Sequence, residues 1–435
     1  MKIYSYPSES AEEQVASIIS RGLDYSAEDL ENVTAILETV KKEGDAALVK
    51  YTNRFDSPGL TADTLKVSEV EFADAFAAVD DKFIATLDRA AAQIEAFHKR
   101  QRQNSWFTSD RPGVFLGQMV NPVDGVGVYA PGAKGGKTPL VSSVLMGGIP
   151  AKIAGVENVC LMTPPRQDGT INPHLLVAAK KTGIDHVYKA GSAWAIGALA
   201  YGTEQVEKVD VIVGPGNIYV TLAKKIVAGT VGIDMIAGPS EILVIADESA
   251  VPEFTAADLL SQAEHDILAS AILVTTSAAF AEKVVAAVKA QLSTLPRKEI
   301  AEKSLEKHGA VMVVPDMEVA IALANRLAPE HLELQVKDPF EHMGRIRNAG
   351  AIFMGNYTPE PVGDYIAGPN HVLPTAGTAR FASALSVDNF IKKTSLIHYS
   401  KEAFLDEAED IVRLAETEGL GAHAASVKVR LGKKA

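Results

Sequence analysis

The sequence predicts an α/β protein built from two Rossmann-like parallel-sheet units, with a helical N-terminal arm and a helical C-terminal tail. Short strand-like runs alternate with helical patterns through the middle of the chain, which is typical of parallel sheets flanked by helices. A change of composition near Gly238 divides these runs into two units, and both ends show helical periodicity. With 435 residues, of which 47% are hydrophobic, the chain is long enough for two or three packed domains.

The N-terminal part is predicted to form helices at 27–51 and 67–102, because apolar residues recur there at three- and four-residue spacing. Strands are predicted at 125–129, 159–163, 186–189, 209–213, 242–246, 271–275, 310–314 and 350–354. Further helices are predicted at 141–154, where Pro150 would introduce a kink, from about 218, at 252–268 and at 401–418.

The composition argues against several classes of function. A net charge of −13 without any basic run argues against non-specific nucleic-acid binding. No apolar run approaches the roughly 20 residues that span a bilayer, and the N-terminus lacks the apolar core of a signal peptide. The single cysteine, Cys160, allows no intrachain disulfide and fits a reducing cytoplasm. We expect it to be buried and inert, which excludes a cysteine thiolate as a catalytic nucleophile.

A carboxylate and an imidazole, Glu330 and His331, follow Pro329 at the end of a helical pattern. Because Pro329 disfavours helical geometry at Ala328, the helix should end at Leu327 and leave the pair at an element boundary. Both groups carry protons near neutral pH when their surroundings tune them, and Glu330 is the natural base for hydrating an aldehyde. The plainer interpretation is a surface turn with two solvated polar groups.

Further clusters carry metal-binding side chains. Gln262 and His265 are three residues apart on a predicted helix, so their side chains should share one face. Asp364 lies in a loop rich in glycine and proline, and His423 lies close to the C-terminus. Two imidazoles, a carboxylate and an amide oxygen form a mixed site suited to zinc or a similar divalent ion. Taken singly, His265 is as readily a capping or solvated residue, and His423 a residue of the tail.

Two glycine-containing segments bear on dinucleotide binding. The glycines of Gly125-x-Gly127-x-x-Ala130 lie inside a predicted strand, so this segment is interpreted as strand packing. The segment Gly214–Asn217 follows a predicted strand and precedes a helix, where backbone N–H groups favour an anion.

Five segments of the chain resemble histidinol dehydrogenase, and they occur in the order typical of that family. They are Ala237–Glu241, Gln262–His265, Ala328–Glu333, Gly363–Thr375 and Glu418–His423. The resemblance extends over essentially the whole chain, and five separate matches of this length are a specific signal.

The resemblance implies a zinc-dependent, NAD-linked oxidation of L-histidinol to L-histidine through L-histidinal, the last steps of histidine biosynthesis. His331 would take the hydroxyl proton, and Glu330 would activate the water that hydrates the aldehyde. One zinc ion per subunit would be bound by Gln262, His265, Asp364 and His423. The substrate would contact these four residues together with Ser240, His331, His371 and Glu418, and NAD would contact Tyr129, Trp194 and Asn217. The family further implies a homodimer whose C-terminal tails complete the active sites of the partner.

The implied organisation has an arm (1–28), a first α/β domain with the metal and catalytic residues (29–128 and 237–380), a second for NAD (129–236) and the tail (381–435). Two departures from the family pattern lie at the expected cofactor site. Trp194 replaces a glutamine, and an indole cannot supply the paired donor and acceptor of an amide. The segment Pro131–Lys134 lacks one of two usual glycines and precedes a longer loop.

Other functions would use similar residues. A metallohydrolase would combine a His/Asp metal site with Glu330 as base and would need no NAD. A paralogous enzyme would oxidise another primary alcohol, such as a sulfonated diol, with the same machinery. His371 and Glu418 favour a cationic amino alcohol, since a sulfonate site should contain arginine or lysine. A non-catalytic binding role would leave the convergent polar groups without use.

Overall fold

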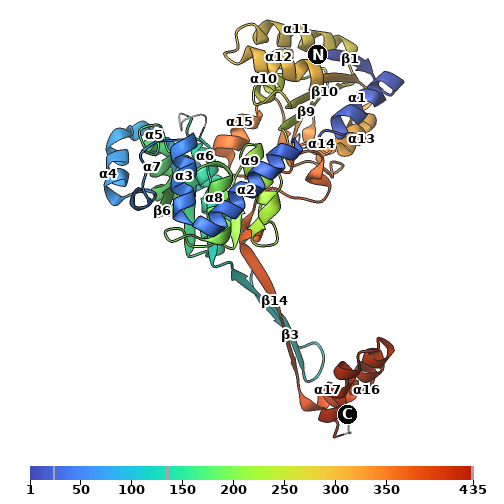
Figure 1. The fold of residues 1–435 in the computed structure, drawn as a ribbon. Helices are drawn as coiled ribbons and strands as arrows, with labels where there is room; N and C mark the ends of the chain where they lie inside the picture. Colours follow the sequence, from blue (N-terminus) through green and yellow to red (C-terminus); the bar gives the residue numbers. More distant parts are fainter. Residues whose placement is uncertain (23–24, 133–137, 433–435) are drawn as a thin grey trace. The chain divides into compact units, whose positions relative to one another are not determined.

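The computed structural model describes residues 1–22, 25–132 and 138–432, and it divides into two compact units (Figure 1). The main unit contains Met1–Gln101 and Val123–Phe390, and the extension unit contains Arg102–Pro122 and Ile391–Ala435. Two parallel sheets flanked by helices form the main unit, which confirms the predicted fold class. None of the helices in the described ranges is both long enough and apolar enough to cross a bilayer.

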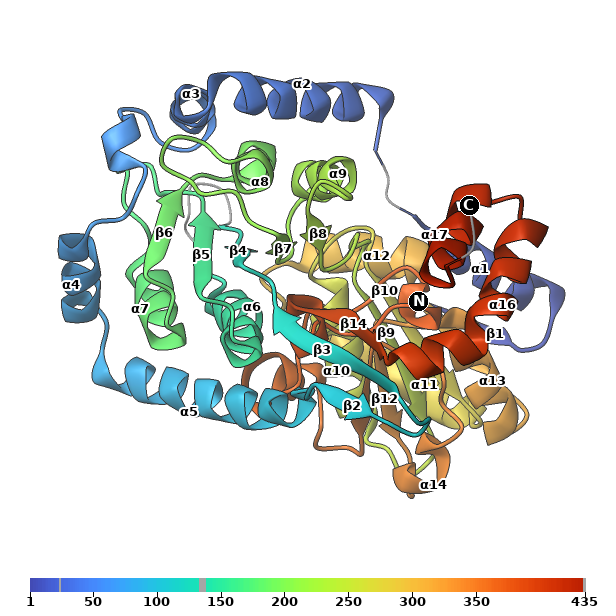
Figure 2. The ribbon, with the colours of Figure 1, turned by 90° about the horizontal axis from the view of Figure 1, so that it is seen from below.

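One sheet of the main unit has five parallel strands in the order β6-β5-β4-β7-β8. These are β4 (Gly125–Tyr129), β5 (Asn158–Thr163), β6 (His186–Lys189), β7 (Val211–Val213) and β8 (Gly232–Ile233). One face is covered by α2 (Ala27–Glu43), α3 (Asp45–Phe55), α8 (Ser192–Tyr201) and α9 (Ile218–Val227) (Figure 2). The other is covered by α4 (Glu69–Ala78), α5 (Asp81–His98), α6 (Val141–Ala154) and α7 (Pro173–Thr182). Because both faces are buried, the central strands are continuous apolar runs.

The second sheet has six parallel strands in the order β1-β11-β10-β9-β12-β13. These are β1 (Lys2–Ser5), β9 (Glu241–Ala246), β10 (Ser270–Thr275), β11 (Ala310–Val313), β12 (His331–Gln335) and β13 (Ala351–Met354). Helices α1 (Glu9–Ile19) and α13 (Met317–Leu327) pack on one face, and α10 (Pro252–Ala263), α11 (Ala278–Leu292) and α12 (Lys298–His308) pack on the other. Two short helices, α14 (Pro339–Met343) and α15 (Glu360–Val362), follow the last two strands, and a π-helical turn at Gly363–Ala367 continues α15.

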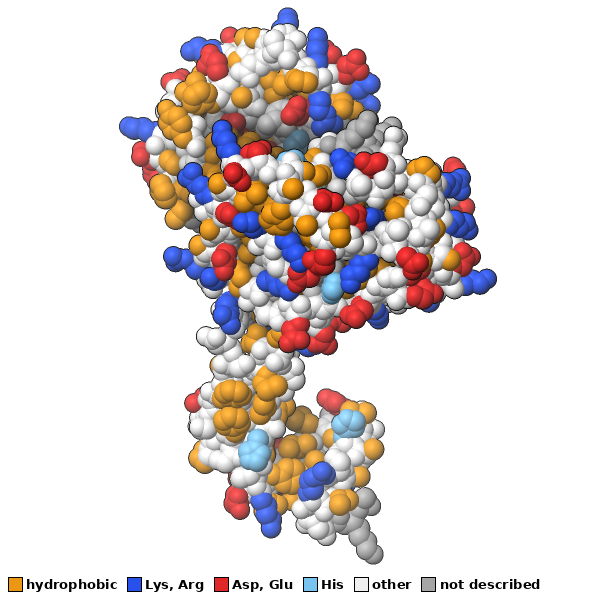
Figure 3. All heavy atoms as spheres, turned by 90° about the vertical axis from the view of Figure 1, so that its left-hand side faces the viewer, with side chains coloured by type: hydrophobic (Ala, Val, Ile, Leu, Met, Phe, Trp, Pro, Cys, Tyr) orange, Lys and Arg blue, Asp and Glu red, His pale blue; other side chains and the backbone are white. Residues whose placement is uncertain are grey.

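The extension unit is a three-stranded antiparallel sheet followed by two helices. Its elements are β2 (Trp106–Thr108), β3 (Val114–Pro122), β14 (Ile391–Tyr399), α16 (Lys401–Thr417) and α17 (Gly421–Arg430). The buried side chains of the two helices are small or few: Ala408, Ala415, Ala424 and Val427. Large apolar side chains remain exposed, and Figure 3 shows apolar groups gathered on this unit. Such a unit buries too little apolar surface to be stable by itself.

The sequence predicts the strands of the main unit well but joins helices that the structure separates. The helix expected at 27–51 is interrupted at Gly44, which has a φ of 53° and separates α2 from α3. The helix expected at 67–102 is interrupted because Asp80 caps α5, accepting a hydrogen bond from the backbone of the first turn. Apolar periodicity continues across both breaks, so the capping residues were the only local signal for them.

Both ends contain helices, as predicted, and each also supplies a strand that was not predicted. Lys2–Ser5 forms β1 beside β11, and β14 pairs with β3 along its whole length. The prediction that residues 29–101 accompany the catalytic stretch also differs from the structure, because α2 to α5 pack on the five-stranded sheet. The choice between two similar apolar sheet faces is a long-range one that helical periodicity does not encode.

Candidate active site

The predicted proton carriers lie at the amino end of one strand of the six-stranded sheet, β12, beside its neighbour β9. Helix α13 ends at Leu327, as the following proline led us to expect, and Ala328 adopts a left-handed conformation with a φ of 50°. The chain then turns into β12, so that His331 lies in register with Ile242 of β9. Glu330 and His331 are only 7% and 4% exposed, which rules out a solvated surface turn.

One residue, Glu241 at the start of β9, holds both proton carriers through its backbone. Its N–H donates to Glu330 Oε2 over 3.0 Å, and its carbonyl oxygen accepts a hydrogen bond from His331 Nδ1 over 3.0 Å. Because a carbonyl oxygen only accepts, Nδ1 carries the proton of the neutral ring. The other ring nitrogen, Nε2, is therefore left with its lone pair free to take a proton.

Burial tunes the two groups in opposite directions. It lowers the pKa of His331 to about 3, so the imidazole is neutral and ready to act as a base at neutral pH. Burial also raises the pKa of Glu330 well above its usual value, and the nearby carboxylates of Glu360, Glu241 and Asp364 add to this. A nearby positive charge would favour the ionised form of Glu330, which is the form that acts as a base.

The side chain of Glu241 is directed elsewhere by a buried ion pair. Arg21, which follows α1, donates from Nη2 to Glu241 Oε1 over 2.6 Å and to the Ser270 hydroxyl over 2.9 Å. Its Nη1 donates to the carbonyl oxygen of Leu268 over 2.7 Å. These contacts fix the amino ends of β9 and β10, and with them the backbone groups that orient Glu330 and His331.

A group of potential metal ligands lies beside His331. One ligand atom each of His331, Glu360 and Asp364 lies within 4.8 Å of the others. Asp364 belongs to the π-helical turn, a conformation frequent at functional sites, and burial raises its pKa to about 6. Burial likewise raises the pKa of Glu360 to about 8, helped by Asp364 and Asp258. Glu360 was not predicted as a site residue. Its four-residue spacing from Asp364 in a helical segment could have indicated that the two side chains share a face.

The two predicted ligands of α10 also lie in this region, with a change of local structure. The predicted shared helix face is wrong, because α10 ends at Ala263 and His265 lies beyond its C-cap. The two side chains still meet, with Gln262 Nε2 3.5 Å from His265 Nδ1. Burial lowers the pKa of His265, and His265 in turn helps to lower the pKa of His331, so the two imidazoles are neighbours.

These residues fit a divalent metal ion. Within the described part of the chain, Gln262 Oε1, Glu360 Oε2 and His371 Nε2 are buried and have no hydrogen-bond partner. Buried polar atoms without partners are costly, which indicates that something else satisfies them. Neutral imidazoles, carboxylates and an amide oxygen are ligands that zinc accepts. A divalent cation would also favour the ionised carboxylates and lower their raised pKa values.

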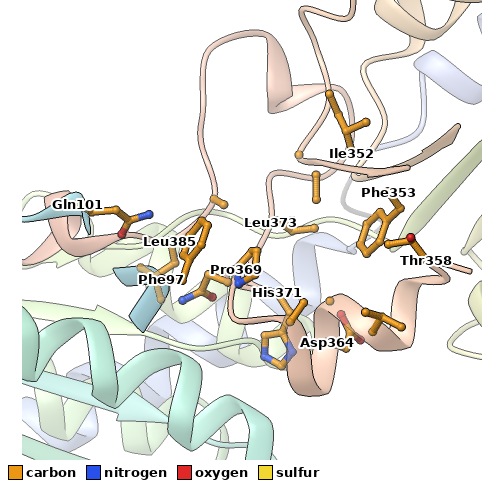
Figure 4. Close-up of a pocket in the computed structure, with 17 residues that line it drawn as sticks. Phe97, Gln101, Ile352, Phe353, Thr358, Asp364, Pro369, His371, Leu373 and Leu385 are labelled. Atoms are coloured by element: carbon orange, nitrogen blue, oxygen red, sulfur yellow. The ribbon is translucent and has the colours of Figure 1, made fainter. Parts of the chain in front are cut away.

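A cavity of about 340 Å³ opens next to this group. Asp364 and His371 lie close together at one end of it, and apolar side chains such as Phe353, Leu373 and Leu385 line the rest (Figure 4). Burial lowers the pKa of His371 to about 4. A cavity with a polar end and an apolar wall suits a small molecule with a polar head.

Three further predicted site residues, Ser240, Glu418 and His423, lie on other elements. Ser240 precedes β9 directly, and its carbonyl oxygen accepts the backbone N–H of Ser270 over 3.0 Å. Glu418 follows α16 and His423 lies in α17, so both belong to the extension unit. Within the main unit, Asp364 lies beside His331, and Gln262 lies beside His265.

A second cavity, of about 670 Å³, lies at the carboxyl ends of the five-stranded sheet, where α/β sheets bind their ligands. Trp194 and Asn217, which the resemblance implies as cofactor contacts, are among the residues that line it. Asn217 caps α9 by accepting the N–H of Val220 over 3.2 Å. Tyr129 lies deeper, where its hydroxyl accepts the N–H of Ser192 over 3.0 Å.

The glycines of β4 and the single cysteine have structural roles near this cavity. Gly125 and Gly127 lie within β4, and a Cβ on Gly127 would lie 2.6 Å from Leu199, so these glycines serve strand packing as predicted. Most of the unusual loop after Gly132 lies outside the described residues. Cys160 is buried in β5, and burial raises the pKa of its thiol to about 12, which leaves it unreactive.

Comparison with known proteins identifies the family. The model for a family described as histidinol dehydrogenase matches residues 20–431. The chain belongs to the histidinol dehydrogenase family. It is therefore an oxidoreductase, and the metallohydrolase interpretation is rejected.

Relatives support this assignment over nearly the full length. The chain is 57% identical to a histidinol dehydrogenase from Desulfotalea psychrophila over 92% of each chain, and 54% identical to one from Syntrophotalea carbinolica over 99% of each. A crystal structure of histidinol dehydrogenase from Elizabethkingia anophelis superposes with a TM-score of 0.92 at 42% identity, covering 99% of this chain and 98% of that one.

Proposed function

We propose that this protein catalyses the zinc-dependent, NAD-linked oxidation of L-histidinol to L-histidine through L-histidinal. The observation that carries the proposal is the buried Glu330–His331 pair, held by the backbone of Glu241 beside a group of metal-type ligands. A base that is neutral at working pH suits alcohol oxidation, and a carboxylate beside it suits hydration of an aldehyde. Since the only cysteine is buried and unreactive, a thiol-bound intermediate is not available.

The protein groups divide the proton chemistry between two oxidations. In the first, His331 Nε2 takes the proton of the substrate hydroxyl. Glu330 then takes a proton from water as it adds to the aldehyde, while His331 returns its proton to the aldehyde oxygen. The neutral His331 next takes the hydroxyl proton of the resulting hydrate. NAD, when bound, accepts a hydride in each oxidation. One alcohol, one water and two NAD+ thus give one carboxylate, two NADH and three protons.

We assign the zinc ligands to Gln262, His265 and Asp364 of one chain and to His423 of the partner subunit. Zinc, when bound, would hold the nitrogen donors of the substrate and keep its carbinol carbon in place. Its charge would also keep Glu330 ionised, which the raised pKa of that buried carboxyl otherwise opposes. Glu360 lies beside Asp364, and a cation bound there would favour its ionised form.

Substrate recognition would come from Ser240, His371 and Glu418 in addition to the zinc ligands. His371 lines the cavity beside Asp364, and its Nε2 has no partner in the described chain. In the proposed arrangement Glu418 of the partner subunit faces the ammonium group. The described lining of the cavity contains no arginine or lysine, so a cationic amino alcohol fits better than a sulfonated diol.

We propose a homodimer in which Glu418 and His423 of the extension unit reach the active site of the partner subunit. That unit exposes Leu405, Leu414 and Val429 on its helices, and Ile397 is 71% exposed on β14. Exposed apolar surface of this kind usually marks an interface. A second copy of the chain would cover it and would receive two site residues in return. We place the enzyme in the cytoplasm because its single cysteine suits a reducing compartment.

The proposal is tested by assaying the purified protein with L-histidinol and NAD and following NADH absorbance. We expect activity that disappears with a metal chelator and returns when zinc is added, because the substrate would be held through the metal. A sulfonated diol of similar size should give no NADH under the same conditions. Full activity after complete removal of metal, or a preference for the sulfonated diol, would contradict the proposal.

A further inference from the structure

The cavity of the five-stranded sheet contains a carboxyl group that the proposed chemistry does not use. Asp56 follows α3 directly and lines this cavity together with Trp194, Ser192 and Asn217. Its Oδ2 atom is buried and accepts no hydrogen bond within the described part of the chain. Burial raises the pKa of this carboxyl to about 6. A half-buried carboxylate without donors loses hydration and gains nothing in return, unless a ligand supplies the donors.

Asp56 is held in place by an aromatic stack that includes the unusual Trp194. The indole packs against both Tyr51 and Phe55 of α3, with ring centroids 5.8 Å and 5.6 Å away. Its N–H donates to the Thr52 hydroxyl over 3.1 Å. The glutamine-to-tryptophan departure therefore fixes the last turn of α3 on α8, and Asp56 is the next residue. Trp194 offers the cavity a flat apolar surface rather than a polar amide.

The neighbours of Asp56 indicate which part of a dinucleotide would meet it. Phe55 is 56% exposed and lines the cavity, and an exposed aromatic ring suits stacking with a purine. The sugar attached to that purine would then lie next to Asp56. A carboxylate has two acceptor oxygens, and a ribose has two neighbouring hydroxyl donors.

We propose that Asp56 binds the 2′- and 3′-hydroxyls of the adenosine ribose and so makes the enzyme selective for NAD over NADP. The inference rests on the proposed function, because it assumes that this cavity takes the dinucleotide. A 2′-phosphate would remove one donor and place negative charge against a carboxylate, which is the repulsive element that selectivity requires. Asp56 is thus a specificity-determining residue, distinct from the groups that handle protons and metal.

The test compares binding of NAD and NADP to wild-type protein and to Asp56→Asn by isothermal titration calorimetry. The amide keeps the shape and removes the charge, so we expect NAD to bind more weakly and NADP more tightly. The dissociation constant of NADP divided by that of NAD should therefore fall by about tenfold or more, as expected when a like-charge contact is removed. Asp63→Asn is a matched control, since Asp63 is exposed, lies seven residues away and does not line the cavity. It should leave the ratio unchanged.

A second probe keeps the inference testable if Asp56→Asn folds poorly. The analogue 2′-deoxy-NAD lacks one donor and should bind wild-type protein about tenfold more weakly than NAD, as expected for a lost hydrogen bond to a charged group. The assignment of Asp56 would be overturned if Asp56→Asn left the ratio of the NADP and NAD dissociation constants unchanged. It would also be overturned if wild-type protein bound NAD and 2′-deoxy-NAD equally well. Neither result would affect the cofactor proposal. Failure of the wild-type protein to bind either nucleotide would instead overturn the cofactor proposal and this inference with it.

Discussion

His331→Asn should lose both oxidations, whereas Glu330→Gln should lose only the second. Each oxidation requires a base for a hydroxyl proton, and His331 Nε2 is the neutral, buried acceptor for it. Glu330 is needed only when water adds to the aldehyde. For each affected step we expect a loss on the order of 10²–10⁴, typical of a missing general base. Both changes keep size and hydrogen-bonding capacity, so the fold should be retained. The measurement is the single-turnover rate with L-histidinol and, separately, with L-histidinal.

His308→Asn is a suitable control, because His308 lies on α12 outside the site. It should leave both rates close to those of the wild-type protein. A normal rate of either half-reaction in His331→Asn would remove that residue from the corresponding step. Equal damage to both half-reactions in Glu330→Gln would mean that its contribution is structural or shared.

Mixing two inactive proteins should restore activity if the active sites are shared between subunits. One protein carries His423→Ala, and the other carries Glu330→Gln together with His331→Asn. In a heterodimer, each site would combine Glu330 and His331 of one chain with His423 of the other. One site would then carry all three substitutions and the other none, so about half of the sites in the heterodimer would be active. The measurement is NADH formation after subunit exchange, with exchange itself verified by a size or affinity tag on one partner.

The outcome of the mixing experiment distinguishes two arrangements. Recovery of activity supports His423 and Glu418 acting in the site of the partner, as expected for a tail that is ordered only when docked. In self-contained sites every chain keeps its own lesion, so no activity returns. Absence of recovery after verified exchange would therefore refute the shared-site proposal while leaving the reaction itself unaffected.

Local rules predicted the parts of the site that depend on neighbouring residues. The proline at 329 placed the end of α13 and the boundary position of Glu330 and His331, and both are confirmed. The apolar runs predicted the central strands because both faces of each sheet are buried. By contrast, β12 itself was not predicted, since its short segment carries a buried Glu333 and Gln335 that read as surface residues.

Long-range pairing determines what the sequence did not predict. Glu360 approaches His331 only because the chain after β13 turns back beside β12, which no local pattern encodes. The buried position of Glu241, and its backbone contacts to both proton carriers, likewise depend on β9 pairing with β12. Trp194 was expected at the cofactor, but its N–H is already bound to Thr52, a partner 142 residues away in sequence.

The central claim is a four-electron oxidation, and the number of NADH molecules formed per L-histidinol tests it most directly. A limiting amount of L-histidinol should be converted completely in the presence of excess NAD and zinc, with the product identified by chromatography. We expect two NADH and one L-histidine for each L-histidinol, because Glu330 and His331 would together complete both oxidations in one site. One NADH with accumulation of L-histidinal, or no NADH at all, would contradict it.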